Sequence, residues 1–169
     1  KTLVSTLMSA RTNDRVTIPI AEKLFNKYNS IEKLAKANVE DIALIIRPVN
    51  FYKGKAKRIK ELAGILVKDY GSKVPHDFNK LIELPGVGRK TANVFLAEYE
   101  HDTIGVDTHL SYISRYLGWT KHADQLKTEL DLQKLFPKRL WGELNWVLVR
   151  FGQSYPNRKE KNSLLDQIK

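Results

Sequence analysis

Cysteine is absent from this sequence: none of its 169 residues is one. The chain can therefore form no disulfide and can offer no thiolate to a zinc ion or to an iron–sulfur cluster. Its four histidines are scattered without the spacing of metal ligands. We expect neither a metal site nor a bound cofactor.

Long apolar runs are absent as well. No stretch approaches the roughly 20 apolar residues of a membrane span, and no signal peptide is recognisable. We therefore expect an intracellular protein that does not enter a membrane. The chain opens directly on an apolar helical stripe at Leu3, Val4, Leu7 and Met8, so we expect that a preceding segment has been removed or is disordered.

Acidic residues are few relative to basic ones. Lysine and arginine number 29 against 19 aspartates and glutamates, which gives a net charge of +10. Such an excess favours a polyanionic partner, with nucleic acid first and an acidic membrane surface second. Simple solubility explains the charge equally well, so the motifs must decide.

Strand signals are weak, because the one candidate, residues 103–106, is short and stands alone. Helical periodicity fills the rest of the chain, and Ser30, Asn38 and Asp77 are placed to cap helices. We expect an all-α fold with lobes at 1–101 and 102–169 and a helix–turn–helix hairpin at about 77–99. The predicted helices are 2–11, 15–28, 31–37, 39–47, 52–69, 78–84, 89–99, 108–117, 123–135, 139–151 and a short one after 161.

The turn of that hairpin is Leu84-Pro85-Gly86-Val87-Gly88. Proline ends the first helix, and the two glycines permit unusual backbone angles and the close approach of a ligand. Leu84 and Val87 can pack back between the helices, so that the amides of Gly86, Gly88 and the next helix's first turn point outward. Free amides at the positive end of a helix dipole form an anion site. An ordinary helix–turn–helix corner is the alternative.

Lys90 and Asp107 are the candidate reactive residues. Lys90 lies in the first turn of a helix, where the dipole opposes a cation and favours the neutral, nucleophilic amine. A solvated lysine that binds phosphate by charge alone is the alternative. Asp107 precedes a helix and can cap it. Its carboxylate can also stabilise positive charge on a sugar during cleavage of a glycosidic bond.

Five stretches of the chain resemble one known family. They closely match the helix–hairpin–helix plus Gly-Pro-Asp superfamily of DNA glycosylases, and within it the endonuclease III branch. The resemblance covers nearly the whole chain, and its central motif is highly specific. The matching stretches are LPGVGRKTAN at 84–93, VDTH at 106–109, LMSARTND at 7–14, NFYKGKA at 50–56 and WVLVRFG at 146–152.

The resemblance implies a two-lobed all-α enzyme with its active site in the cleft between the lobes. Such an enzyme acts as a monomer on duplex DNA that contains a damaged base or an abasic site, in the cytoplasm or nucleoid of a prokaryote or in the nucleus of a eukaryote. Lys90 would attack the sugar carbon that bears a damaged pyrimidine and form a Schiff base, after which elimination nicks the strand. Asp107 takes the place of the family's essential aspartate. Gly86, Val87, Gly88 and Arg89 would grip a DNA phosphate, which carries no base specificity.

Opening of the duplex is expected to involve two further loops. A flipped base leaves a gap that a side chain must fill. By resemblance, Arg11 and Phe51 occupy the wedge positions, where relatives often carry glutamine and leucine. Lys53 and Lys55 could hold phosphates, although a solvated helix face is an equal alternative. His109 matches the motif and is expected to support DNA binding.

The sequence departs from the family near its C-terminus. Relatives usually carry four cysteines there that hold a four-iron cluster, but residues from Gly152 onward contain none. We therefore expect the second lobe to be held by packing alone, with contributions from Trp141, Trp146 and Phe151. The family's leading helix is missing too, which points to a minimal enzyme or to lost activity.

Two rival functions stay open at the level of sequence. One is a monofunctional glycosylase for thymine or uracil opposite guanine, in which another residue commonly replaces the lysine. The other is a non-catalytic DNA-binding module that keeps the hairpin for phosphate binding. The presence of both Lys90 and Asp107 favours the bifunctional glycosylase/AP lyase over both rivals.

Overall fold

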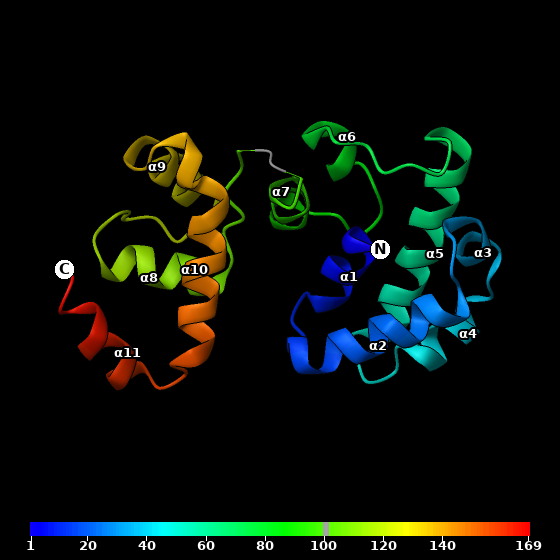
Figure 1. Cartoon of the computed structure of the whole chain (residues 1–169), viewed down its shortest axis with the longest axis horizontal. Coiled ribbons are helices and arrows are strands. Elements are labelled where there is room, and N and C mark those ends of the chain that lie inside the picture. The colour runs from blue at the N-terminus through cyan, green and yellow to red at the C-terminus, as the bar shows by residue number, and fades with distance from the viewer. Residues whose placement is uncertain (100–101) are drawn as a thin grey trace. The chain divides into compact units, whose positions relative to one another are not determined.

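The computed structural model describes residues 1–99 and 102–169, and every regular element in these ranges is helical (Figure 1). The all-α prediction is therefore confirmed. The chain divides into two compact units, Lys1–Thr91 and Ala92–Lys169. The boundary expected after residue 101 falls on a position outside the described residues. Among the described helices, none is both long enough and apolar enough to cross a membrane.

The first unit contains six complete helices and the start of a seventh. They run close to the predicted ranges, because apolar periodicity and caps determine where they begin and end. Predicted helix ends extend up to two residues further than the observed ones. The helices are α1 Thr2–Ser9, α2 Asp14–Lys27, α3 Ile31–Lys36, α4 Val39–Ile45, α5 Tyr52–Asp69, α6 Phe78–Ile82 and the first residues of α7 Arg89–Ala97.

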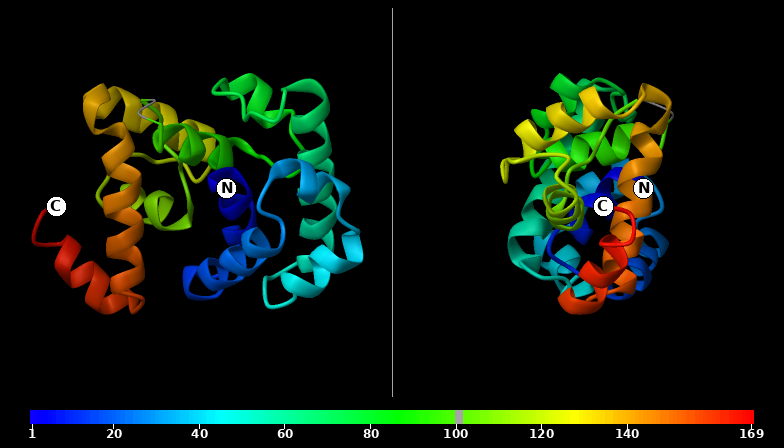
Figure 2. Two further views of the ribbon diagram at one scale, coloured as in Figure 1. Left: turned by 45° about the vertical axis from the view of Figure 1, so that its right-hand side comes forward. Right: turned by 90° about the vertical axis from the view of Figure 1, so that its left-hand side faces the viewer.

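Helix α5 is the centre of the first unit. Its residues Ile59, Leu62, Ala63 and Leu66 recur every three or four positions and are all almost completely buried. α5 packs against α1, α3 and α4, and Figures 1 and 2 show α3 and α4 beside it. Full burial of each large aliphatic side chain contributes about 1.5–3 kcal/mol, so this stripe stabilises the core of the first unit.

Of the three helix caps predicted in the first unit, two are present. The Ser30 side chain accepts a hydrogen bond from the amide of Lys33 at 3.3 Å, and Asp77 accepts one from Lys80 at 2.9 Å. Asn38 precedes α4 as predicted, but its side chain makes no capping hydrogen bond. The Asp77 cap places the start of α6 and hence the first arm of the hairpin.

The second unit is built around α8 Thr108–Tyr116 and α10 Trp141–Ser154, which pack together (Figure 2). Their buried residues form one apolar cluster with the segment before α8. The other elements of this unit are the rest of α7 from Ala92, α9 Gln125–Leu135, the 3₁₀ helix η1 Lys138–Leu140 and α11 Arg158–Leu165. The predicted short C-terminal helix begins earlier than residue 161, because Asn157 caps α11 by accepting from the amide of Lys159 at 2.9 Å.

The predicted aromatic support of this unit is partly wrong. Trp141 and Phe151 pack against the apolar cluster, and the indole of Trp141 donates to the Phe136 carbonyl at 2.8 Å. Trp146 is instead 61% exposed. Its indole is not part of the apolar cluster, and the Arg150 guanidinium lies 5.1 Å from the ring centroid.

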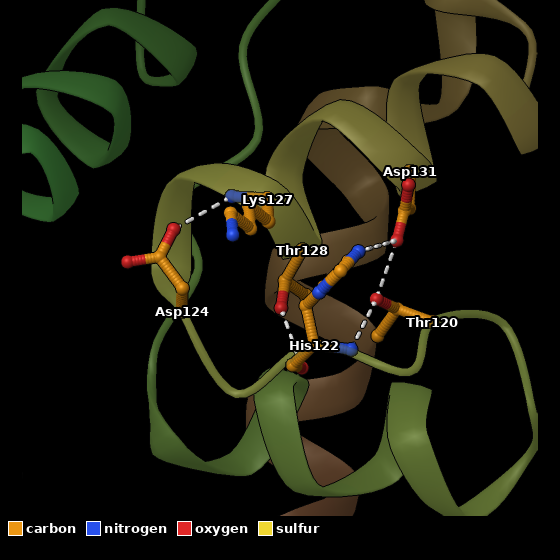
Figure 3. A network of polar contacts seen from close by, with 6 residues as sticks. All are labelled: Thr120, His122, Asp124, Lys127, Thr128 and Asp131. Carbon is orange, nitrogen blue, oxygen red and sulfur yellow. Dashed lines mark hydrogen bonds and ion pairs between the residues drawn. The ribbon is translucent and has the colours of Figure 1, made fainter.

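A polar network orders the connection between α8 and α9 (Figure 3). The Thr120 hydroxyl donates to Asp131 at 2.6 Å and accepts from the His122 amide at 3.1 Å. Asp124 caps α9 by accepting from the Lys127 amide at 2.9 Å. These bonds hold the start of α9 in place.

Candidate active site

The hairpin turn joins α6 to α7 through a hydrogen-bonded β-turn. The Val87 amide donates to the Leu84 carbonyl at 3.0 Å, with Pro85 and Gly86 at the two central positions. Gly86 has φ +80°, a left-handed angle that suits the third residue of such a turn. Leu84 and Val87 are 3% and 5% exposed. Both side chains therefore anchor the turn from inside, as the sequence predicts, and Val87 can offer only its backbone to a ligand.

The two glycines of the turn differ in backbone angle and in the space around the position of a Cβ atom. A Cβ on Gly86 would lie 2.9 Å from side-chain carbons of both Arg58 and Leu7. Gly88 does not have a positive φ, and nothing lies within 4 Å of its hypothetical Cβ. Of the two glycines, only Gly86 uses the unusual backbone angles that glycine permits. The open face of Gly88 instead lets a ligand come close to the backbone where α7 begins.

Replacement of Gly88 by alanine is expected to weaken binding to duplex DNA by about tenfold while leaving the fold intact, because one methyl group blocks a close approach to backbone amides. Fluorescence anisotropy on a labelled duplex measures the affinity, and thermal unfolding checks the fold. Gly64→Ala on α5 is the matched control, since a Cβ there also meets nothing within 4 Å. Equal affinities for the two variants would contradict this role of Gly88.

Lys90 and Arg89 form the first turn of α7. Both side chains are half-buried, and the Arg89 guanidinium lies 4.7 Å from the centroid of the Phe78 ring on α6. This contact braces the two arms of the hairpin against each other. The amides of a helix's first turn have no acceptor within the helix, so the start of α7 combines an anion-binding backbone with a lysine.

Asp107 caps α8 through one of its two carboxylate oxygens. Its Oδ1 accepts from the Leu110 amide at 2.8 Å. Within the part of the chain that the structure describes, Oδ2 accepts no hydrogen bond, and the residue is only half-buried. The capping prediction is confirmed, and the cap fixes the carboxylate while leaving one oxygen available for chemistry.

The segment before Asp107 is held by two asparagines that the sequence analysis missed. Asn93 on α7 donates from its side chain to the Ile104 carbonyl at 3.0 Å, and Asn145 on α10 donates to the Gly105 carbonyl. Ile104 and Val106 are buried beside them. Asn93 is buried and Asn145 half-buried, and an amide side chain among the apolar residues of a helix face is the signal that could have identified them.

Arg11 and Phe51 lie side by side, although 40 positions separate them in sequence. The Arg11 guanidinium carbon is 5.9 Å from the centroid of the Phe51 ring. Both residues have left-handed backbone, with φ +56° and +58°. Phe51 is 67% exposed, and Arg11 is exposed as well. The two predicted wedge loops thus present one combined surface.

Lys53 and Lys55 have opposite environments. Lys53 is exposed at the start of α5, where it can contact phosphate. Lys55 is only 5% exposed, and its ammonium group donates to the Met8 and Ala10 carbonyls at 2.7 and 2.6 Å. The expectation that Lys55 contacts DNA is therefore wrong: it lies four residues before Ile59 on the buried face of α5, and that position was the signal for burial.

The stability of the chain should reflect the burial of Lys55. Burial lowers the pKa of Lys55 from 10.5 to about 8. Between these two pH values the unfolded chain binds the proton more strongly than the folded chain does. Burial of the charged Lys55 therefore lowers the unfolding free energy by its full amount below pH 8, and this loss shrinks as the pH rises toward 10.5. Wild type should gain up to about 1.4 kcal/mol of unfolding free energy per pH unit relative to Lys55→Met. Urea unfolding at pH 7.5, 8.5 and 9.5 measures this, and parallel pH profiles would contradict it.

His109 packs inside the second unit. A Cβ on Gly152 of α10 would lie 2.7 Å from Cγ and 2.8 Å from Cβ of His109. The imidazole therefore lies directly on the Gly152 backbone and holds α8 against α10. This packing role accounts for both residues, and the sequence analysis had assigned His109 to DNA binding.

An iron–sulfur cluster of the family's kind does not fit these residues. Such a cluster needs four thiolate ligands, and the 169 residues contain no cysteine. After Gly152 the chain instead continues into α11, which is attached to α8 by two hydrogen bonds. Tyr112 donates to Asn162 at 2.6 Å, and Tyr116 donates to Asp166 at 2.8 Å.

Comparison with known proteins places this geometry in one family. The family model described as HhH-GPD superfamily base excision DNA repair protein matches residues 4–138. Endonuclease III of Thermotoga maritima is 44% identical over 154 residues, which are 90% of this chain and 72% of that protein. A trapped endonuclease III–DNA covalent intermediate matches with a TM-score of 0.88 and 32% identity, over 92% of this chain and 74% of that one.

A thermostable thymine-DNA glycosylase shares the fold at lower similarity. Its structure matches with a TM-score of 0.76 and 27% identity, over 89% of this chain and 71% of that chain. The family match spans both compact units and includes the hairpin, Lys90 and Asp107. The chain belongs to the helix–hairpin–helix plus Gly-Pro-Asp superfamily of base excision DNA repair proteins, as a DNA glycosylase/AP lyase of the endonuclease III kind.

Proposed function

We propose that this enzyme removes damaged, chiefly oxidised, pyrimidines from duplex DNA with Lys90 as its nucleophile and Asp107 as its essential carboxylate. The observation that carries the proposal is the pairing of two features. A glycine hairpin leads directly into Lys90, and Asp107 is fixed as a cap with one carboxylate oxygen unused. One copy of the chain supplies every group required, so we propose that the monomer is active.

The hairpin would bind the DNA backbone next to the damaged nucleotide. The open face of Gly88 and the first-turn amides of α7 suit a phosphate oxygen. Arg11 and Phe51 would enter the base stack when the damaged nucleotide leaves it. These contacts involve the DNA backbone and the gap in the base stack, and they do not depend on the identity of the damaged base. The preference for a particular base must therefore come from the pocket that receives it.

Lys90 would act through its neutral amine. The nitrogen lone pair attacks the sugar carbon that bears the base, the glycosidic bond breaks, and the base leaves with its bonding electrons and takes up a proton. The lysine nitrogen loses a proton to give an N,O-acetal, and opening of the sugar ring, with uptake of a proton by the ring oxygen, converts it into a Schiff base. Loss of a proton from the adjacent carbon then expels the 3′ phosphate. Asp107 would stabilise the positive charge that develops on the sugar.

A covalent trapping experiment tests this function. Duplex DNA with one abasic site is incubated with the enzyme and borohydride, and the products are separated on a denaturing gel. We expect a covalent adduct, together with base release and nicking on a duplex that contains 5-hydroxycytosine. A monofunctional enzyme would release thymine or uracil opposite guanine without an adduct, and a binding module would do neither.

The thymine-DNA glycosylase likeness supports the first rival function. It is lower in identity than the likeness to endonuclease III, at 27% against 32–44%. A lysine at position 90 also supplies the amine that a monofunctional mechanism does not need. We therefore retain the bifunctional reaction as the proposal.

A further inference from the structure

Lys55 is a buried cation whose partners are all neutral oxygens. Its ammonium group donates to the carbonyls of Met8 and Ala10 at 2.7 and 2.6 Å and lies 3.3 Å from the Thr12 hydroxyl. Three acceptors match the three N–H groups of an ammonium ion. The carbonyls lie at the end of α1, where helix geometry leaves them unpaired and the dipole favours a cation. No carboxylate of the described residues forms an ion pair with it.

These three oxygens lie on both sides of Arg11, at the end of α1 and in the loop that follows it. Asn50 completes the attachment: its side-chain amide donates to the Arg11 carbonyl, and its backbone amide donates to the Thr12 hydroxyl at 3.2 Å. The groups on either side of Arg11 are therefore bound from inside, by Lys55 and Asn50. The loop after α1 and the residues that precede α5 are held together as one rigid element.

The attachment holds a costly conformation. Arg11 and Phe51 both have left-handed backbone, which costs roughly 1–2 kcal/mol for each residue that is not glycine. Phe51 is also two-thirds exposed, at 67%. A hollow of about 710 Å³ lies beside the two side chains, with Ala10, Tyr52 and Arg58 in its lining. Strain and exposure of this kind are characteristic of surfaces built for binding.

We propose that Lys55 is a positioning residue for DNA interrogation: its buried ammonium group sets the loop so that Arg11 and Phe51 project together into the duplex. This inference rests on the function proposed above, because it assigns Arg11 and Phe51 to the gap left by a flipped nucleotide. Lys55 itself touches no DNA. A planar guanidinium beside an aromatic ring is a suitable filler for such a gap, since both can stack on bases.

The test compares two substrates that need different amounts of duplex opening. Lys55→Met removes all three donors at nearly constant length. Borohydride trapping is timed on an abasic site in duplex DNA and on the same strand without its complement. We expect trapping on the duplex to slow by about tenfold or more, and trapping on the single strand to stay within about twofold of wild type.

Lys60→Met is the matched control. Lys60 lies on the same helix, and its ammonium group donates to the Ala37 carbonyl at 2.6 Å. This bond is remote in sequence from Arg11 and Phe51. Lys60→Met should trap both substrates at the wild-type rate. Hydrogen exchange should rise at residues 9–13 and 50–53 in Lys55→Met and should stay unchanged there in Lys60→Met.

Each remaining outcome has a definite meaning. Equal slowing of Lys55→Met on both substrates, or no slowing on either, would overturn the positioning role. Absence of trapping by wild type on both substrates would refute the proposed function itself. If Lys55→Met does not fold, Thr12→Val removes one acceptor of the same attachment. This variant should trap the duplex more slowly than wild type, by a smaller factor, and the single strand at the wild-type rate. A Thr12→Val rate on the duplex equal to that of wild type would overturn the inference.

Discussion

Replacement of Lys90 by glutamine is expected to lower strand nicking and Schiff-base formation by at least about a thousandfold, because the reaction loses its only proposed nucleophile. Glutamine is close to lysine in length and has high helix propensity, so α7 should persist. Affinity for an abasic duplex should change little, since we propose that the Gly88 backbone and the first-turn amides of α7 bind the phosphate. Gel-based nicking assays and anisotropy measure the two quantities separately.

Lys80→Gln is the control for the charge change. Lys80 is exposed on α6 of the same hairpin, and its side chain has no proposed role in the reaction. This variant should nick abasic DNA within about twofold of the wild-type rate. Comparable losses in Lys80→Gln and Lys90→Gln would show that the hairpin needs positive charge and not a specific amine.

Replacement of Asp107 by asparagine is expected to slow base release by about a hundredfold or more without unfolding the second unit. Asparagine caps helices as well as aspartate does, so the 2.8 Å hydrogen bond from the Leu110 amide can be retained. The variant loses the negative charge that we propose stabilises the sugar cation. Single-turnover base release from a duplex that contains 5-hydroxycytosine measures the effect.

Asp124→Asn separates catalysis from capping. Asp124 caps α9 in the same unit with the same geometry, by accepting from the Lys127 amide at 2.9 Å. Its replacement should leave base release unchanged. If Asp107→Asn releases base at the wild-type rate while Asp107→Ala unfolds, then Asp107 is only a cap and the catalytic assignment is wrong.

Local signals in the sequence are enough to predict the helices and the turn. Ser30 and Asp77 act as the caps that their positions indicate, and Pro85 with Gly86 forms the expected turn. Such features depend on residues a few positions apart, which is the range over which caps and turns operate. The same is true of Asp107, whose capping bond reaches three residues ahead.

The tertiary environment of single side chains could not be predicted in this way. Arg11 and Phe51 adopt left-handed backbone without being glycine, and they meet where hydrogen bonds from Asn50 and Lys55 join two segments that are distant in sequence. Charge suggested that Lys55 lies on the surface, but its buried position depends on acceptors from α1. Trp146 is exposed despite its size, because its place on α10 faces away from the apolar cluster.

The identity of the amine that bonds to the sugar tests the assignment of Lys90 as the nucleophile most directly. Wild-type enzyme trapped on an abasic duplex by borohydride can be digested, and the modified peptide identified by mass spectrometry. We predict a single adduct on Lys90. Burial lowers the pKa of the Lys55 ammonium group to about 8, which makes this side chain a competing amine. An adduct on Lys55, or on any lysine other than Lys90, would contradict the proposed mechanism.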